Sequence, residues 1–321
     1  MAEKVTESKL STAEQVTSLW ELGGLSVSQL SKNVWRAFND NFLLDRSAAL
    51  AFNFILAMFP LLLFLLAILG MFAARGTALR TNLMQYLAEV LPPAGFQVVS
   101  HTLAEVTKNA GGGKLTLGVA LTLWFASGGM SSMISALDGA YAVREGRSWF
   151  KVRGIAVSLT VAISILVISA LVAILAGSYA ANVLGTHYSL GQAAVISWRV
   201  AEIIVALFFV ALSFSLIYYW GPDLHEQHWY WITPGSVVGV LLWVAASFGF
   251  RAYLHFFNSY SKTYGSLGAA IILLMWLYIT GLAFLIGGAV NAQIEHAAAL
   301  RGHPEAKAPG EKKVPEEKKA A

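Results

Sequence analysis

The sequence predicts an all-α, polytopic membrane protein with six transmembrane helices and additional interfacial amphipathic helices. Of its 321 residues, 57% are hydrophobic and only 12% are charged, whereas soluble domains carry about 25% charged residues. Six stretches are apolar over about the 20 residues that a helix needs to cross the hydrocarbon core of a bilayer. Lys and Arg are more frequent on the face that carries the two terminal segments than on the opposite face, an asymmetry that sets the orientation of membrane proteins.

The first predicted span, residues 48–72, holds 25 residues without a charge and carries Pro60 near its centre. As a helix it is roughly 37 Å long, enough to cross the bilayer with some tilt. Proline at this place removes a backbone hydrogen bond, so we expect a kink. The preceding segment, residues 1–44, ends in a stretch (25–44) with apolar side chains at helical spacing among charged ones. This pattern indicates a helix at the membrane interface; a solvated helix packed on the bundle fits it equally well.

The remaining chain predicts the rest of a membrane domain over residues 45–295 and a disordered cytoplasmic tail over residues 296–321. Further spans are expected at about 115–137, 155–175, 200–220, 232–250 and 267–290. Between the first two spans, residues 79–106 carry two short apolar stripes that we expect at the interface. The tail is rich in Ala, Lys, Glu and Pro, a composition that does not support a packed core.

Small residues in the spans are expected to allow close helix packing. They are Gly128, Gly129, Gly265, Gly268, Gly287 and Gly288. Tyr264 and Gly265 precede the predicted last span, so we expect a tight turn there that aims the helix.

The positions of Lys and Arg predict the orientation. The face that carries both termini holds fifteen of them and the opposite face seven. Because basic residues are retained on the cytoplasmic side, we expect both termini in the cytoplasm.

Three separated stretches resemble the YihY/BrkB family of bacterial inner-membrane proteins, once labelled ribonuclease BN. They are residues 48–63 with their central proline, residues 134–149 with Tyr, Glu, Arg and an aromatic residue after a helix end, and residues 260–295 with Tyr-Gly, an apolar-Trp-x-Tyr step and a late Asn. The resemblance covers most of residues 45–295 and implies a six-span helical fold in the bacterial cytoplasmic membrane. It implies little about mechanism.

The chain departs from the family pattern at two positions. Asp138 stands where the family usually has Asn, and Ala289 stands where it often has Glu. The second difference removes an acid from the last span, which weakens a proton-coupled mechanism for this member.

Polar side chains in or near the spans are costly to place in lipid and are therefore the candidate ligand-binding residues. They are Asn53, Asp138, Tyr141, Arg147, Glu202, Lys262, Tyr264 and Asn291. Each has a structural alternative: an inward-facing Asn can join helices, Glu202 can pair with Arg199, and the basic residues after the second span can serve orientation alone.

No enzyme chemistry is indicated. The sequence lacks cysteine and shows no phosphate-binding loop or nucleophile elbow, and only His225 and His228 lie close together. We therefore expect no cofactor, no metal, no catalytic residue and no nucleic-acid partner. The favoured function is the handling of a lipid or other amphiphile by a transporter or flippase, with membrane lipids as partners. The alternative is a non-transporting scaffold for envelope proteins, and a homo-oligomer or an envelope protein partner stays open.

Overall fold

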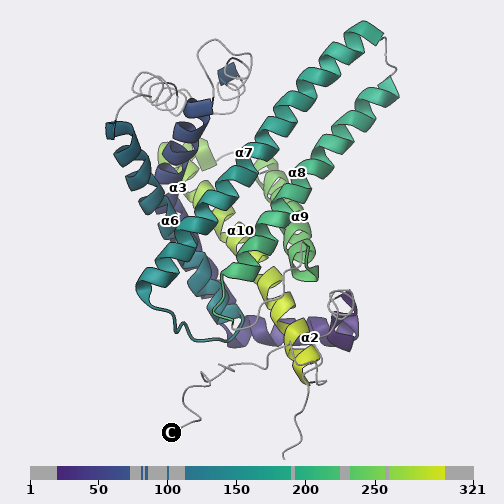
Figure 1. Ribbon diagram of the computed structural model, residues 1–321. Coiled ribbons are helices and arrows are strands. Elements are labelled where there is room, and N and C mark those ends of the chain that lie inside the picture. Colours follow the sequence, from purple (N-terminus) through teal and green to yellow (C-terminus); the bar gives the residue numbers. More distant parts are fainter. Residues whose placement is uncertain are drawn as a thin grey trace, which may run out of the picture. The chain divides into compact units, whose positions relative to one another are not determined.

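The computed structural model describes residues 20–72, 81, 84–85, 100, 113–188, 192–224, 232–256 and 260–300. Within these residues the chain forms seven α-helices and one 3₁₀ turn, with no strand (Figure 1). The elements are η1 (Leu22–Gly24), α2 (Val27–Asp40), α3 (Leu43–Phe72), α6 (Gly113–Ala140), α7 (Trp149–Tyr188), α8 (Gln192–Trp220), α9 (Pro234–Phe256) and α10 (Tyr260–Leu300). The predicted all-α class is therefore confirmed.

Five described stretches are long and apolar enough to cross a membrane. They are Ala120–Ala140, Trp149–Ile174, Val200–Trp220, Pro234–Tyr253 and Ala270–Ala298. The 30-residue helix α3 covers the first predicted span and continues through Pro60. The chain is a multi-pass membrane protein.

The helices extend beyond the apolar windows that predicted them. α7 has 40 residues and α10 has 41, so each is about 60 Å long, twice the hydrocarbon thickness. An apolar window marks only the part of a helix that lies in the hydrocarbon core. The helix itself, with its backbone hydrogen bonds, continues beyond that window at both ends.

Two sequence predictions are wrong for this reason. Tyr264 and Gly265 lie within α10 and form no turn before it, since the helix already begins at Tyr260. The disordered tail does not begin at His296, because α10 continues to Leu300. The stripes predicted over residues 79–106 lie almost wholly outside the described residues.

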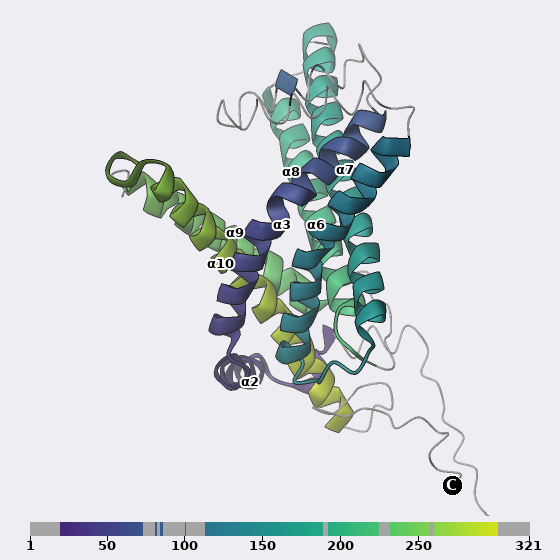
Figure 2. The ribbon, with the colours of Figure 1, turned by 90° about the vertical axis from the view of Figure 1, so that its left-hand side faces the viewer.

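Contacts between residues divide the chain into two compact units. Unit 1 comprises Met1–Phe52, Ser132–Val152 and Phe214–Ala321, and unit 2 comprises Asn53–Ser131 and Arg153–Ser213. In unit 2, α7 and α8 run antiparallel and side by side (Figures 1 and 2). There α3 approaches α6 closely at Gly129, where an added Cβ would lie 2.9 Å from the Cβ of Ala57.

The core of unit 1 lies between α9, α10 and the last turns of α8. The Tyr218 ring stacks on Phe284, with 4.8 Å between ring centroids, and its hydroxyl donates to the Phe284 carbonyl at 2.6 Å. That hydroxyl lies over Gly287, where an added Cβ would be 2.5 Å away. Helix α2 crosses the C-terminal end of α10 in the same unit (Figure 1).

The glycines of the spans differ in how closely other helices approach them. Gly129, Gly287 and Gly288 each face a neighbour closer than 3.0 Å from an added Cβ, so close packing there is confirmed. Gly128 is different: within the described part of the chain, an added Cβ meets nothing within 4 Å, and its packing role stays a prediction. Gly265 and Gly268 lie in the first turns of α10, whose side-chain surroundings fall outside the described part.

Candidate functional site

Helix α2 is defined by local signals that the sequence carries. Ser26 and Gln29 form a reciprocal capping box, in which the Gln29 amide donates to Ser26 Oγ at 3.2 Å and the Ser26 amide donates to Gln29 Oε1 at 3.0 Å. The helix ends at Asp40, and Phe42 follows with φ 52° in the left-handed region. This residue turns the chain into α3.

The sides of α2 meet different surroundings. Leu30 and Val34 pack against Val290 and Ile294 of α10. A second side bears exposed apolar and aromatic residues: Val27 is 73% exposed, Trp35 is 67% exposed, and Trp35 stacks on Phe38. The third side is polar. An amphipathic helix with an exposed aromatic side is typical of the membrane interface.

The turn before α2 is fitted tightly against α10. Gly23 has φ +60°, and an added Cβ there would lie 2.5 Å from the Ile294 carbonyl oxygen. Only glycine tolerates both conditions without strain. The turn thereby fixes the start of α2, and Leu25 with it, beside the end of α10.

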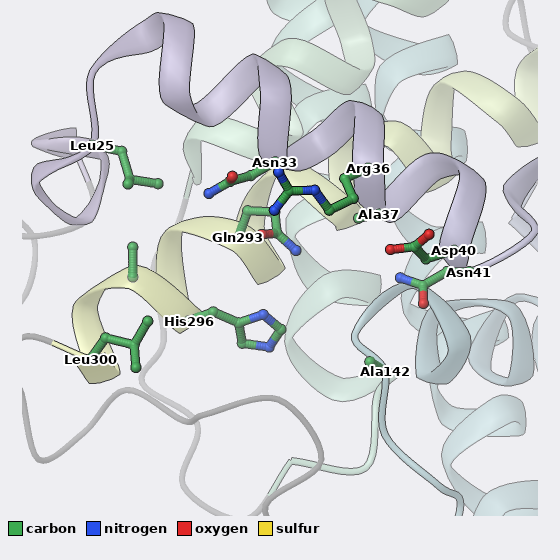
Figure 3. A pocket seen from close by; sticks show the side chains of 11 residues that line it. Leu25, Asn33, Arg36, Ala37, Asp40, Asn41, Ala142, Gln293, His296 and Leu300 are labelled. Carbon is green, nitrogen blue, oxygen red and sulfur yellow. The ribbon is translucent and has the colours of Figure 1, made fainter.

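A pocket of about 340 Å³ opens between α2 and the end of α10 (Figure 3). This volume lies at the lower end of the roughly 300–1,000 Å³ of small-molecule sites. Its lining residues are Leu25, Asn33, Arg36, Ala37, Asp40, Asn41, Ala142, Gln293, His296, Ala297 and Leu300. All of them belong to unit 1.

Most polar side chains of the pocket have no protein partner. Among the described residues, no hydrogen bond or ion pair joins Asn33, Arg36, Asp40, Gln293 or His296 to another group. Asn41 alone is engaged, since its side-chain amide donates to the Ala140 carbonyl at 3.4 Å. A pocket lined by unpaired donors and acceptors can bind a polar group without first breaking internal bonds.

A second polar cluster joins the α6–α7 loop to the α8–α9 loop. The Arg147 guanidinium donates to Glu145 at 2.6 and 2.9 Å and to the Gly221 carbonyl at 2.8 Å. Asp223 accepts from the Gly146 amide at 2.9 Å and lies 3.7 Å from Arg147 Nε. The side chain of Arg147 is only 9% exposed. Its contacts link two loops that are more than 70 residues apart in sequence.

The charges of this loop cluster stabilise one another. Partial burial alone would raise the pKa of Glu145, but the hydrogen bonds and charge of Arg147 outweigh it and hold that pKa below its usual value. Burial alone would lower the pKa of Arg147, and the contact with Glu145, together with the charges of Asp138 and Asp223, raises it instead. Both groups are therefore charged at neutral pH.

Asp138, Tyr141 and Asn291 also lie in unit 1 as buried residues with structural contacts. Asp138 is 4% exposed, and its Oδ1 accepts from the Asp223 amide at 2.8 Å. Asn291 accepts from the Gly235 amide at 2.8 Å and donates to Thr233 Oγ1 at 2.9 Å, so it caps the start of α9. Burial raises the pKa of the Tyr141 phenol well above its ordinary value, and the negative charge of Glu295 adds to this.

The other predicted site residues are not gathered at one place. Asn53 and Glu202 lie in α3 and α8 of unit 2. Glu202 Oε1 is buried and, within the described residues, has no hydrogen-bond partner. Lys262 and Tyr264 lie in α10, and their side chains fall outside the described part. Whether any of these residues binds a ligand stays a prediction.

Sequence reasoning missed the pocket, although one signal was present. Asn33, Arg36 and Asp40 recur at intervals of three and four residues, which places them along one side of a helix. Gln293 and His296 are likewise three residues apart on α10. Nothing in the sequence indicates that these two rows face each other.

The matches with known proteins cover most of the chain. A family model described as "Virulence factor BrkB" matches residues 34–311. A Bacillus subtilis protein named "Putative ribonuclease-like protein YfkH" is 31% identical over 264 residues, which cover 80% of this chain and 91% of that protein. No solved structure gives a significant match.

More distant relatives are longer than this chain. The UPF0761 membrane protein Smlt0865 of Stenotrophomonas maltophilia is 25% identical over 280 residues, or 84% of this chain but only 61% of that protein. A UPF0761 membrane protein of Xanthomonas oryzae is 26% identical over 278 residues, with the same 61% coverage. The chain thus spans less than two thirds of these relatives' length.

Proposed function

We propose that this chain, which belongs to the BrkB family of membrane proteins, binds a lipid or other amphiphile at the membrane interface and moves it across or within the bacterial inner membrane. One observation carries the proposal: α2 combines an exposed aromatic side with a polar pocket at the end of the membrane-crossing helix α10. An amphiphile needs both environments, one for its chains and one for its headgroup.

The predicted orientation agrees with this role. Under it, α2 and the α6–α7 loop lie at the cytoplasmic interface, where basic residues attract anionic lipid. Trp149 and Phe150 are 61% and 80% exposed at the start of α7, beside Lys151. Exposed aromatic residues next to a cation are typical of the headgroup region.

The proposed function includes no chemical step by the protein. The ribonuclease-like name belongs to the Bacillus relative. Among the described residues there is no group of three or more His, Cys, Asp or Glu side chains that could hold a metal ion. Incubation of the purified protein with labelled RNA tests whether it is a ribonuclease. Cleavage that disappears when the protein is digested with protease would argue against a function without a chemical step.

Lipid movement can be measured directly. The full-length protein is reconstituted into liposomes that contain a fluorescent phospholipid, and dithionite bleaches the outer leaflet. We expect the bleached fraction to rise from about half in protein-free liposomes toward completion when the protein is present. Gly128→Ala is the control variant. It should move lipid as the wild type does, because an added Cβ at this position meets no described atom within 4 Å. If folded wild-type protein moves no lipid, the proposed transport function is wrong, and a non-transporting scaffold for envelope proteins is favoured instead.

A further inference from the structure

We propose that the pocket between α2 and α10 recognises a zwitterionic phosphoamine headgroup, a phosphate diester bearing a primary amine, of the lipid that the proposed function requires. The inference rests on that function for its biological role, but the binding itself is measured separately. It follows from the order in which apolar, cationic and anionic side chains line the pocket.

The lining changes character from one end of the pocket to the other. Figure 3 shows Leu25 and Leu300 together at one end, Arg36 between Asn33 and Gln293 in the middle, and Asp40 beside Asn41 at the other end. The His296 ring lies at the middle of the pocket, across from α2. The sequence of surroundings is therefore apolar, then cationic with amide groups, then anionic.

This order matches the order of groups in an amphiphile with a phosphoamine headgroup. The glycerol and first chain carbons would contact Leu25 and Leu300. The phosphate would accept from the Arg36 guanidinium, with the Asn33 and Gln293 amides as further donors, since planar guanidinium groups suit phosphate oxygens. The amine would donate to the Asp40 carboxylate.

The two opposite charges of the pocket are available for such a ligand. Arg36 and Asp40 lie one helical turn apart on α2, a spacing at which Arg and Asp can pair. In the described part of the chain they form no ion pair with each other or with another residue. A purely anionic headgroup would leave the Asp40 carboxylate unpaired and repelled, so the site discriminates against it.

The rest of the fold holds these groups in place. Asn41 is anchored to the Ala140 carbonyl, and Arg46 Nε donates to the Asn41 carbonyl at 2.9 Å. Both contacts fix the end of α2 at Asp40. At the other end, the capping box and the glycine turn fix Leu25.

Native mass spectrometry of the full-length protein tests the proposal. Protein stripped of lipid receives equal amounts of phosphatidylethanolamine and phosphatidylglycerol, and the bound adducts are counted. We expect the ethanolamine lipid to bind about tenfold better, the factor that one charge-assisted hydrogen bond contributes. Soluble glycerophosphoethanolamine in a separate arm shows whether the headgroup alone competes or the chains are also needed; either result supports the site.

Variants identify the pocket as the place of binding. Asp40→Asn is expected to remove the preference for the ethanolamine lipid, and Asp40→Glu to keep it. Arg36→Gln is expected to weaken both lipids by about tenfold. Lys32→Gln is the matched control, because it removes a cation from an exposed position of the same helix outside the pocket. Thermal unfolding of each variant checks that it is folded.

Two results would overturn the proposal: equal binding of both lipids by the wild type, or the same loss in Lys32→Gln as in Arg36→Gln. Selective binding without lipid movement in liposomes would refute transport and leave the headgroup site standing. Lipid movement without selective binding would refute the site and leave transport standing.

Discussion

Replacing Gly287 by alanine tests how closely α9 and α10 pack. An added Cβ at this position would lie 2.5 Å from the Gly235 carbonyl oxygen, 2.5 Å from the Tyr218 hydroxyl and 3.0 Å from the Cα of Gly239. Two of these three atoms belong to the backbone of α9 and cannot turn aside as a side chain can. The helices must therefore separate, and the Tyr218 hydroxyl must be displaced.

The expected cost follows from opposing terms. Alanine gains about 1 kcal/mol over glycine in helix propensity. Overpacking costs about 1–3 kcal/mol or more, and displacing the Tyr218 hydroxyl from the Phe284 carbonyl, now at 2.6 Å, costs about 1 kcal/mol. We expect a net destabilisation of about 1–3 kcal/mol.

Gly128→Ala is the control, because it makes the same chemical change inside α6. An added Cβ there meets no described atom within 4 Å, so only the propensity gain of up to about 1 kcal/mol applies. The two variants should thus differ by about 2–4 kcal/mol. For a chain of 321 residues this corresponds to roughly 3–6 °C in Tm.

Intrinsic fluorescence of the ten tryptophans in detergent reports the unfolding of each variant. We expect Gly287→Ala to melt well below the wild type and Gly128→Ala at or slightly above it. Equal melting temperatures for all three proteins would refute the close packing of α9 on α10.

Three further predictions concern the loops and the orientation. Arg147→Ala should lower the free energy of unfolding by about 2–3 kcal/mol, because Glu145 and the Gly221 carbonyl lose the guanidinium as donor and Glu145 keeps only the backbone amide of residue 147; a Tm unchanged from the wild type would contradict this. Glu145→Gln should lower Tm at neutral pH, and the gap to the wild type should close as the pH falls below 4.5. The reason is that a lowered pKa gives stability that is complete above the unfolded-state value of 4.5 and is lost as the pH falls through the folded-state value; a gap that widens in acid would exclude the ion pair as its cause. Because the chain has no cysteine, single cysteines at Lys151 and Lys114 can be labelled in intact cells with an impermeant maleimide, and only Lys114→Cys should react if both termini are cytoplasmic.

The class of fold was predictable because each membrane-crossing helix must itself be apolar over the thickness of the bilayer, whatever it packs against. An apolar window of about 20 residues reports a span wherever its partners lie, and the six predicted windows fall within α3, α6, α7, α8, α9 and α10, apart from two residues before α9. Helix ends were less predictable. The last turns of α10, through His296 to Leu300, are helical because Ile294 and Ala298 pack against α2 and the turn before it, as the contacts of Leu30 and Gly23 show. Such tertiary contacts leave no mark in the local sequence.

The site was harder to predict for the same reason. The amphipathic pattern of residues 25–44 correctly indicated a helix at α2, but it gave no indication of the partner. The pocket exists because Asn33 and Arg36 meet Gln293, about 260 residues further along the chain. Similarly, Arg147 was predictable as a cation near the membrane, whereas its contacts with Gly221 and Asp223 depend on two distant loops meeting.

What separates the two polar clusters is how far the protein itself satisfies their hydrogen-bonding groups. Arg147 and Asn291 have their donors and acceptors engaged by backbone and side chains, and a ligand would have to displace these bonds at a cost comparable to what it gains. In the described part of the chain, Arg36 and Asp40 have no such engagement. A ligand there displaces only water from these two solvent-exposed side chains, and its net gain is the difference between the bonds to the ligand and the bonds to water. By this criterion the loop cluster stabilises the fold, and the pocket between α2 and α10 is where binding is favourable.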